Sequence, residues 1–138
     1  MEIYSIRGVC LMKAYKIKIE LLGSEPTIWR RVIMPADATF NRLHDVIQNV
    51  LNFKSGYPCN ASHLFHFDLS AHNIRVTNDE EVYQGHQHFK KNRKEIEAKL
   101  NAMDSVFAQR QLENLKTIIR KPTGIKIDKY LEKDGQIN

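Results

Sequence analysis

The first regular pattern in the chain is a strict alternation of apolar and charged residues over positions 15–21. A period of two is typical of a β-strand that buries one face. Turn-forming residues follow between Gly23 and Pro26, and residues 28–34 form a second strand-like run. We therefore expect residues 15–34 to form a β-hairpin. One side of its second strand carries Ile28, Val32 and Met34. The other side carries Trp29, Arg31 and Ile33.

Residues 40–51 carry the clearest helical pattern, because their apolar side chains recur at steps of three and four. This stripe comprises Phe40, Leu43, Val46, Ile47, Val50 and Leu51. Asp37 or Thr39 can cap the first turn, since a short side-chain oxygen accepts hydrogen bonds from the free amides there. Gly56 and Pro58 are expected to stop the helix. The apolar stripe is the natural cover for the buried face of the hairpin.

Short strands are predicted after this helix. Residues 63–69 return to a period of two, and residues 74–76 predict a further short strand. Asn73 lies in the turn between them. The order of hairpin, covering helix and short strands indicates an α+β fold class.

Helices are predicted for the last part of the chain. From Asp79 to Met103 apolar residues step by three and four, although Arg93 interrupts the stripe. A stripe in a different phase follows, formed by Ala108, Leu112, Leu115 and Ile119. Asp104 and Ser105 mark the change of phase, so we expect a helical hairpin or one kinked helix as an insertion. Residues 122–124 end this region, and residues 127–131 predict one more helical turn.

The length and composition suit one small globular domain. The chain has 138 residues, of which 42% are hydrophobic and 27% are charged, and these values argue against disorder. No stretch approaches the roughly 20 apolar residues of a membrane-spanning helix, and the first residues lack the features of a signal peptide. Cys10 and Cys59 fit two free thiols in a reducing compartment. We expect a cytoplasmic protein with no membrane partner.

The net charge of +5 makes the chain basic, and the positive side chains cluster. A phosphate backbone is attracted to such clusters, so they are candidate nucleic-acid contacts. The candidates are Arg30, Arg31, Lys90, Lys91, Arg93 and Lys94. Glu95 and Glu97 intersperse the helical cluster, as on an ordinary solvated helix, so both interpretations stay open.

Trp29 is flanked by two arginines, and this cluster allows two interpretations. An arginine stacked on a tryptophan combines charge with a flat face and suits an anion or a base. Alternatively, Trp29 packs on the sheet while the arginines cover it with their aliphatic stems, which is the interpretation we favour. A well-formed polar pocket near Trp29, His44 and His63 would favour an enzyme whose site is completed by a partner or by a further segment.

The six histidines and two cysteines raise the question of a metal site. Zinc requires converging nitrogen or sulfur ligands. His63 and His66 on a strand would point to opposite faces, and His86 and His88 on a helix would also diverge. One combination remains, formed by Cys59, His63 and a distant His72 or His44. We expect no metal and no cofactor.

Catalytic sequence patterns are missing. The chain contains no glycine-rich phosphate loop and no nucleophile elbow. The acidic residues 79–81 lie at a predicted helix start, where negative charge complements the exposed amides. We therefore expect that the protein is not an enzyme. The alternative is an enzyme whose site is completed by a partner or by a further segment.

Four segments resemble the plasmid pRiA4b ORF-3-like family: YKIKIEL at 15–21, PTIWRRV at 26–32, FNRLHDVIQ at 40–48 and HLFHF at 63–67. The Pro-x-x-Trp-Arg-Arg sequence followed by Leu-His is the most specific part, and the resemblance covers Met12 to about Asn78. It implies a hairpin, a helix and further strands with a β-grasp-like start. The family occurs in bacteria and archaea, often on plasmids or beside mobile elements, and no reaction is assigned to it. The resemblance therefore implies a fold more than a function.

Two departures from the family pattern bear on the domain boundaries. Family members usually begin at the equivalent of Met12, so residues 1–11 are interpreted as an N-terminal extension and residues 12–138 as one domain. The family's C-terminal Tyr-Asp-Phe-Gly-Asp strand is expected after residues 134–137 and is absent. We expect the domain to be incomplete at this end. A core that lacks its last strand leaves an edge for a second copy to cover, so we expect a homodimer.

Two functions follow from these observations. The first is a protein-interaction module in a mobile-element context, supported by the absence of catalytic patterns and by the incomplete sheet. The second is a nucleic-acid-binding accessory protein, supported by the basic clusters. Binding to DNA at low salt separates the two.

Overall fold

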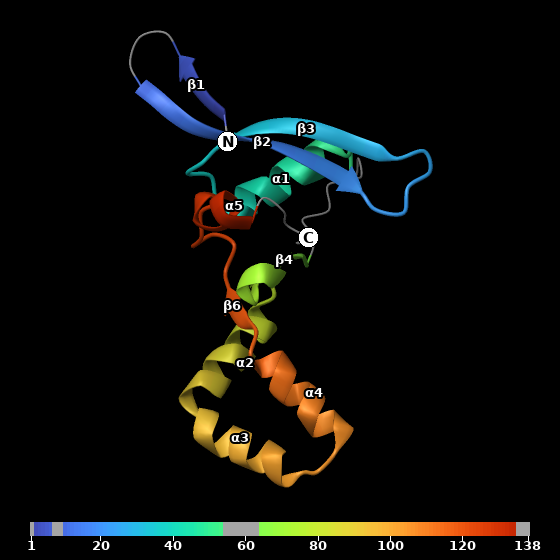
Figure 1. The fold of residues 1–138 in the computed structure, drawn as a ribbon, viewed down its shortest axis with the longest axis vertical. Coiled ribbons are helices and arrows are strands. Elements are labelled where there is room, and N and C mark those ends of the chain that lie inside the picture. The colour runs from blue at the N-terminus through green and yellow to red at the C-terminus, as the bar shows by residue number, and fades with distance from the viewer. Residues whose placement is uncertain (1, 7–9, 54–63, 135–138) are drawn as a thin grey trace. The chain divides into compact units, whose positions relative to one another are not determined.

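The computed structural model describes residues 2–6, 10–53 and 64–134, with side chains for 13–53 and 64–131. Contacts divide the chain into two compact units. The described part of the first unit is 2–6, 10–53 and 123–134, and that of the second is 64–122. Each unit combines strands and helices (Figure 1), so the predicted α+β class is confirmed.

The first unit contains a sheet in the order β1-β2-β3 with antiparallel neighbours. Its strands are β1 (Glu2–Ile6), β2 (Cys10–Leu21) and β3 (Ile28–Pro35). The predicted hairpin is confirmed, with Tyr15 opposite Met34. β2 begins earlier than predicted because its first residues pair with β1, a strand in the segment interpreted as an extension.

The two faces of the β2–β3 hairpin differ in burial. Tyr15, Ile19 and Met34 are buried on one face. Helix α1 (Phe40–Val50) lies along this face (Figure 1), as the sequence predicts. The other face, which we call the outer hairpin face, is exposed and carries Lys16, Lys18, Glu20, Trp29, Arg31 and Ile33.

Helix α1 begins where the sequence predicts. Of the two candidate caps, Thr39 acts, because its hydroxyl accepts a hydrogen bond from a backbone amide of the first turn at 3.2 Å. Phe40 and Leu43 are the buried residues of the helix and contribute to the core under the hairpin. Gly56 and Pro58, the predicted stop, lie outside the described residues.

The chain returns to the first unit at residues 123–134 and closes its core. The Phe40 amide donates a hydrogen bond to the Ile125 carbonyl at 3.1 Å. Ile127 is fully buried, and the Tyr130 ring lies 6.3 Å from the Phe40 ring. Tyr130 belongs to α5 (Asp128–Asp134), which confirms the predicted helical turn.

Asp128 links α5 to β2. Its Oδ1 accepts hydrogen bonds from Lys13 Nζ at 2.6 Å and from the Tyr15 hydroxyl at 2.5 Å. These two hydrogen bonds hold the pKa of the Asp128 carboxyl below its ordinary value, and the bond from Lys13 has the larger effect. Burial, and then the bond to Asp128, raise the pKa of Tyr15.

We expect the chain to lose stability in acid through Asp128. Because the pKa of Asp128 is lower in the folded than in the unfolded chain, its contribution is fully present above about pH 3.9 and is lost as the pH falls through the folded-state value. Urea denaturation at a series of pH values should show a shallower acid dependence in Asp128→Asn. Lys13→Gln should act in the same direction because it removes the first donor. An acid dependence that neither variant changes would contradict this assignment.

The second unit contains a sheet in the order β4-β5-β6. Its strands are β4 (His66–Leu69), β5 (Ile74–Thr77) and β6 (Ile118–Arg120). β4 and β5 are antiparallel, β5 and β6 are parallel, and a short 3₁₀ turn (Ser70–His72) joins the first two. The two predicted strands are confirmed, although β4 is shorter than residues 63–69. His63 lies outside the described residues.

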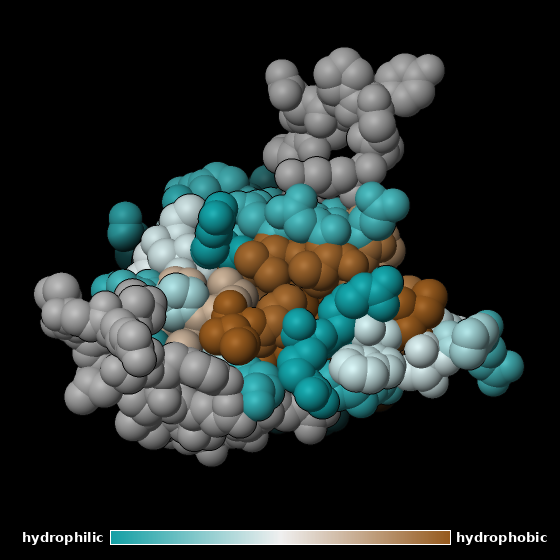
Figure 2. All heavy atoms as spheres, turned by 90° about the horizontal axis from the view of Figure 1, so that it is seen from above, coloured by the Kyte–Doolittle hydropathy of each residue, from teal (hydrophilic) through white to brown (hydrophobic). Residues whose placement is uncertain are grey.

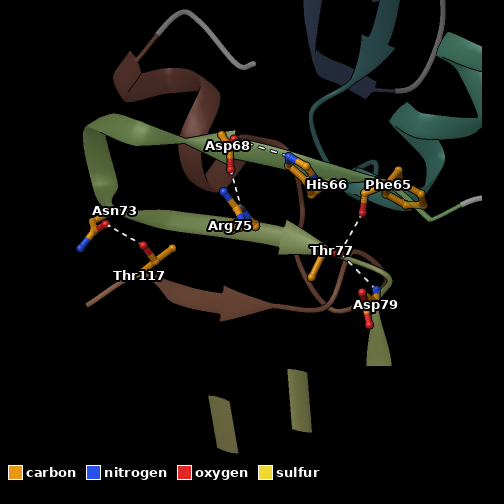
Figure 3. A network of polar contacts seen from close by, with 8 residues as sticks. All are labelled: Phe65, His66, Asp68, Asn73, Arg75, Thr77, Asp79 and Thr117. Carbon is orange, nitrogen blue, oxygen red and sulfur yellow. Dashed lines mark hydrogen bonds and ion pairs between the residues drawn. The ribbon is translucent and has the colours of Figure 1, made fainter. Parts of the chain in front are cut away.

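Polar contacts hold the strands of this sheet together (Figure 3). Asp68 Oδ1 on β4 accepts a hydrogen bond from Arg75 Nε on β5 at 2.7 Å. Asn73 adopts the left-handed conformation at the predicted turn, with φ 54°, which asparagine tolerates better than most residues. Its Oδ1 accepts from the Thr117 hydroxyl at 3.2 Å, and this contact brings the start of β6 to β5.

Three helices separate β5 from β6: α2 (Glu80–Lys91), α3 (Arg93–Ala102) and α4 (Val106–Leu115). Asp79 caps α2, and Ser105 caps α4 after the predicted bend. α3 and α4 contact each other, so the predicted helical hairpin is confirmed, and Asn92 separates α2 from α3.

The sequence-based assignment of Ile119 to the last helical stripe is wrong. Ile119 is buried in β6, opposite Arg75 of β5. Parallel strands need a long crossover connection, and α2, α3 and α4 supply it. The predicted insertion is therefore the crossover of the second sheet.

Candidate binding groove

The crossover helices and β6 line a groove of about 1000 Å³ in the second unit, which we call the helical groove. Its apolar lining residues are Phe89, Val106, Leu112, Leu115 and Ile118. Its basic lining residues are Lys90, Arg93, Arg110, Lys116 and Arg120. The other lining residues are His86, Glu97, Asn101, Gln109 and Glu113.

Local interactions set the walls of the groove. The Ser105 hydroxyl accepts a hydrogen bond from the Ala108 amide at 3.1 Å, so α4 begins directly after the turn that follows α3. At the other end Lys121, next to β6, pairs with Glu80 of α2 at 2.9 Å. The Lys121 ammonium also lies 4.5 Å from the centre of the Tyr83 ring. These contacts keep β6 beside α2.

The apolar lining is unevenly exposed. Phe89 is buried, whereas Leu112, Leu115 and Ile118 are half-buried. Val106, at the start of α4, is 73% exposed although it lines the groove. A row of apolar side chains from α4 and β6 is thus available to the apolar face of a ligand.

The basic lining residues are only partly neutralised. Arg93 Nε pairs with Glu97 at 2.9 Å, and Lys116 Nζ pairs with Glu113 at 2.6 Å. These two pairs use both acidic side chains of the lining. Positive charge is therefore in excess along the groove.

His86 is a buried polar residue of the groove lining. Its ring nitrogen Nε2 has no hydrogen-bond partner among the described residues. The side chain is 9% exposed. Burial is the main cause that lowers the pKa of His86, and the positive charges of Lys90 and Arg120 lower it further. The ring is therefore neutral at pH 7 and sits in a positive field, with a polar atom unpaired.

The predicted cluster at Trp29 lies on the outer hairpin face. The charged groups of Arg31 and Lys18 lie 5.5 and 5.8 Å from the centre of the Trp29 ring. Trp29 is 45% exposed and Ile33 is 57% exposed. The side of the molecule above β2 and β3 shows a hydrophobic band bordered by hydrophilic side chains (Figure 2). Two cations thus lie within cation–π distance of Trp29, and these contacts fit both interpretations of the cluster.

The structure separates the other residues predicted at this cluster. Arg30 lies on the opposite side of β3 from Trp29, where its Nε donates to the Val50 carbonyl at 3.2 Å. His44 is half-buried on α1, which lies along the face of the hairpin opposite Trp29. His63, the third residue of the predicted pocket, lies outside the described residues. Trp29 and His44 therefore do not face a common pocket.

The basic helical cluster divides between two environments. Lys90 and Arg93 line the helical groove, while Lys91 and Lys94 are exposed elsewhere. Arg110, Lys116, Arg120 and His86 also line the groove and were missed as site residues. Their signal in the sequence is weak, because they come from α2, α4 and β6, which are far apart along the chain.

The described residues contain neither a candidate metal site nor a candidate membrane-spanning helix. No group of three or more histidine, cysteine, aspartate or glutamate side chains there could hold a metal ion. Cys59 and His63, which belong to the combination left by the sequence, lie outside the described residues. Within the described ranges, every helix is too short or too polar to span a bilayer.

Comparison with known proteins shows the family of the chain. The family model for plasmid pRiA4b ORF-3-like proteins matches residues 13–136. No curated protein and no solved structure matches the chain significantly. The family match includes all four segments on which the sequence resemblance depends.

Proposed function

Because the chain belongs to the plasmid pRiA4b ORF-3-like family, and this name specifies a plasmid reading frame and no reaction, we propose its function from the groove. The protein is a protein-interaction module without a catalytic site of its own. The helical groove receives an amphipathic helix of a partner protein. One observation carries this proposal, namely that an apolar row from α4 and β6 lines a groove bounded by helices.

The groove suits a helix better than a small ligand. Its volume of about 1000 Å³ is at the upper end of the range for small-molecule pockets, roughly 300–1,000 Å³. An amphipathic helix binds by placing side chains spaced three and four residues apart into such a groove. Leu112, Leu115 and Ile118 offer half-buried aliphatic surface along it, and Val106 extends this surface toward the α3–α4 turn.

The proposal predicts binding of a designed peptide. A fluorescein-labelled amphipathic helix of about 18 residues with one leucine face should bind the chain, measured by anisotropy. Val106→Glu should weaken binding about tenfold, because it places a charge on the apolar lining. Phe107→Glu is the matched control: Phe107 is the next residue of α4, is 63% exposed and does not line the groove. Equal affinity for all three proteins, or no binding at all, would overturn the proposal.

Nucleic-acid binding is a second candidate, favoured by Trp29 on the outer hairpin face. An exposed tryptophan with the charged groups of Lys18 and Arg31 close to its ring suits stacking with an unpaired base and contact with its phosphates. The same titration with labelled single-stranded and duplex DNA at low and moderate salt separates the two functions. Binding that is lost in Trp29→Ala and kept in Val106→Glu would favour this second candidate.

Homodimer formation is a narrower form of the interaction proposal. The sequence argument for it concerns residues 135–138, which lie outside the described residues. Exposed apolar side chains around the α3–α4 turn support self-association: Met103, Val106 and Phe107. Light scattering that gives a mass near 16.1 kDa would exclude a dimer.

A further inference from the structure

The polar side chains that line the helical groove near β6 indicate which chemical groups the bound helix carries. This inference rests on the proposed function. We infer that the bound helix is acidic and that one of its carboxylates docks against His86, Lys90 and Arg120. His86 and Lys90 lie one turn apart on α2, and Arg120 lies on β6, which contacts α2. These three residues line the same groove.

The first argument is the charge left over after internal pairing. Glu97 and Glu113 are already bound to Arg93 and Lys116. Lys90 and Arg110 form no ion pair with any residue that the structure describes. Arg120 Nη1 donates to the neighbouring Ile119 carbonyl at 3.2 Å and likewise has no carboxylate partner in the described part of the chain. An anionic occupant supplies the missing charge.

The second argument is the unpaired nitrogen of His86. A buried polar atom without a partner destabilises the protein, and one that a ligand satisfies favours the complex. Nε2 is shielded from solvent in the free protein and His86 lines the groove, so a carboxylate docked there is the partner that we expect for this atom. Carboxylate oxygens accept several hydrogen bonds, so one group can accept from His86, Lys90 and Arg120 together.

The lining favours a protein carboxylate over a nucleic-acid phosphate. The apolar lining residues next to the basic ones are mainly aliphatic, and the two aromatic rings of the lining, those of Phe89 and His86, belong to side chains only 6% and 9% exposed. Bases bind single-strand sites by stacking on exposed aromatic rings, which this groove lacks. Aliphatic side chains beside cations match a helix that carries leucine on one face and glutamate at its border.

Peptides that differ only in charge test this inference. Two labelled amphipathic helices share one leucine face and carry either glutamate or glutamine at the bordering positions. We expect the glutamate peptide to bind about tenfold more tightly at low salt, and this advantage to shrink at higher salt. Lys90→Gln and Arg120→Gln should each reduce the advantage. Lys91→Gln, at an exposed neighbour outside the lining, should leave it unchanged.

The outcomes separate this inference from the proposed function. Equal affinity for both peptides, with weakening by Val106→Glu, would overturn the carboxylate site and leave the helix-binding groove. Failure of both peptides to bind would overturn both proposals. His86→Phe provides a further measurement: a glutamate advantage fully retained in this variant, with an unchanged circular dichroism spectrum, would exclude His86 from the site.

Discussion

Replacing Phe40 with alanine should lower the free energy of unfolding by about 3–5 kcal/mol. Phe40 is fully buried at the first turn of α1. Its ring lies beside Tyr130, and its amide is bonded to the Ile125 carbonyl, so it joins the helix to the returning segment of the first unit. Truncation to alanine removes apolar burial and leaves a cavity that this packed core cannot fully close.

Urea denaturation measures this loss, and the single tryptophan of the chain provides the signal. Trp29 lies on β3 in the same unit as Phe40, so its fluorescence reports on the affected core. Phe53→Ala is the matched control, because Phe53 is 46% exposed in the same unit and its truncation should change stability by less than about 0.5 kcal/mol. Similar losses in the two variants would show that Phe40 is not part of a packed core.

Val76→Asp should unfold the second unit. Val76 is fully buried in β5, the central strand of the β4-β5-β6 sheet. An aspartate there places an unpaired carboxylate in the buried packing on one face of the sheet, and the expected cost exceeds about 4 kcal/mol. Since the crossover helices depend on the β5–β6 pairing, we expect helical content to fall with it.

Circular dichroism and amide hydrogen exchange over α2, α3 and α4 measure this effect. Val82→Asp is the control, because Val82 lies 42% exposed in the first turn of α2, where an acidic side chain complements the helix amides. Val82→Asp should give nearly the same circular dichroism spectrum and the same amide protection as the wild-type protein. Protected amides in α2–α4 of Val76→Asp would mean that the helices fold without the sheet. That variant should also lose peptide binding, because the groove includes β6.

Much of the fold could be predicted because local signals and the final structure agree. The alternation from Tyr15 to Leu21 and the stripe that starts at Phe40 each mark a buried face directly. The cap residues Thr39, Asp79 and Ser105 all act on the helices that follow them. In these segments the residues that bury a face are close in sequence, so a short window contains the information.

β6 could not be predicted, because its pairing is non-local. Ile118–Arg120 is three residues long and pairs with β5 across the whole helical crossover. Its apolar residues also continue the spacing of the preceding helix, which is why Ile119 was assigned to that stripe. A short parallel strand has no periodic signal of its own, since its partner decides its conformation.

The candidate site shows the same division. Lys90 and Arg93 were predicted from their local cluster and do line the groove. His86 was considered only as a metal ligand, and the sequence does not show that burial leaves its Nε2 unpaired. Arg110 and Arg120 reach the groove from α4 and β6, and no spacing rule connects them to α2.

The sequence by itself determined the hairpin, its covering helix, the helical hairpin and the family, because each depends on patterns within a few turns or strands. Tertiary structure alone decided that Trp29 and His44 fall on different sides of the hairpin and that cations from α2, α4 and β6 meet along one groove. The physical reason is that burial and charge balance at a site sum over residues distant in sequence, and only the folded chain brings those residues together.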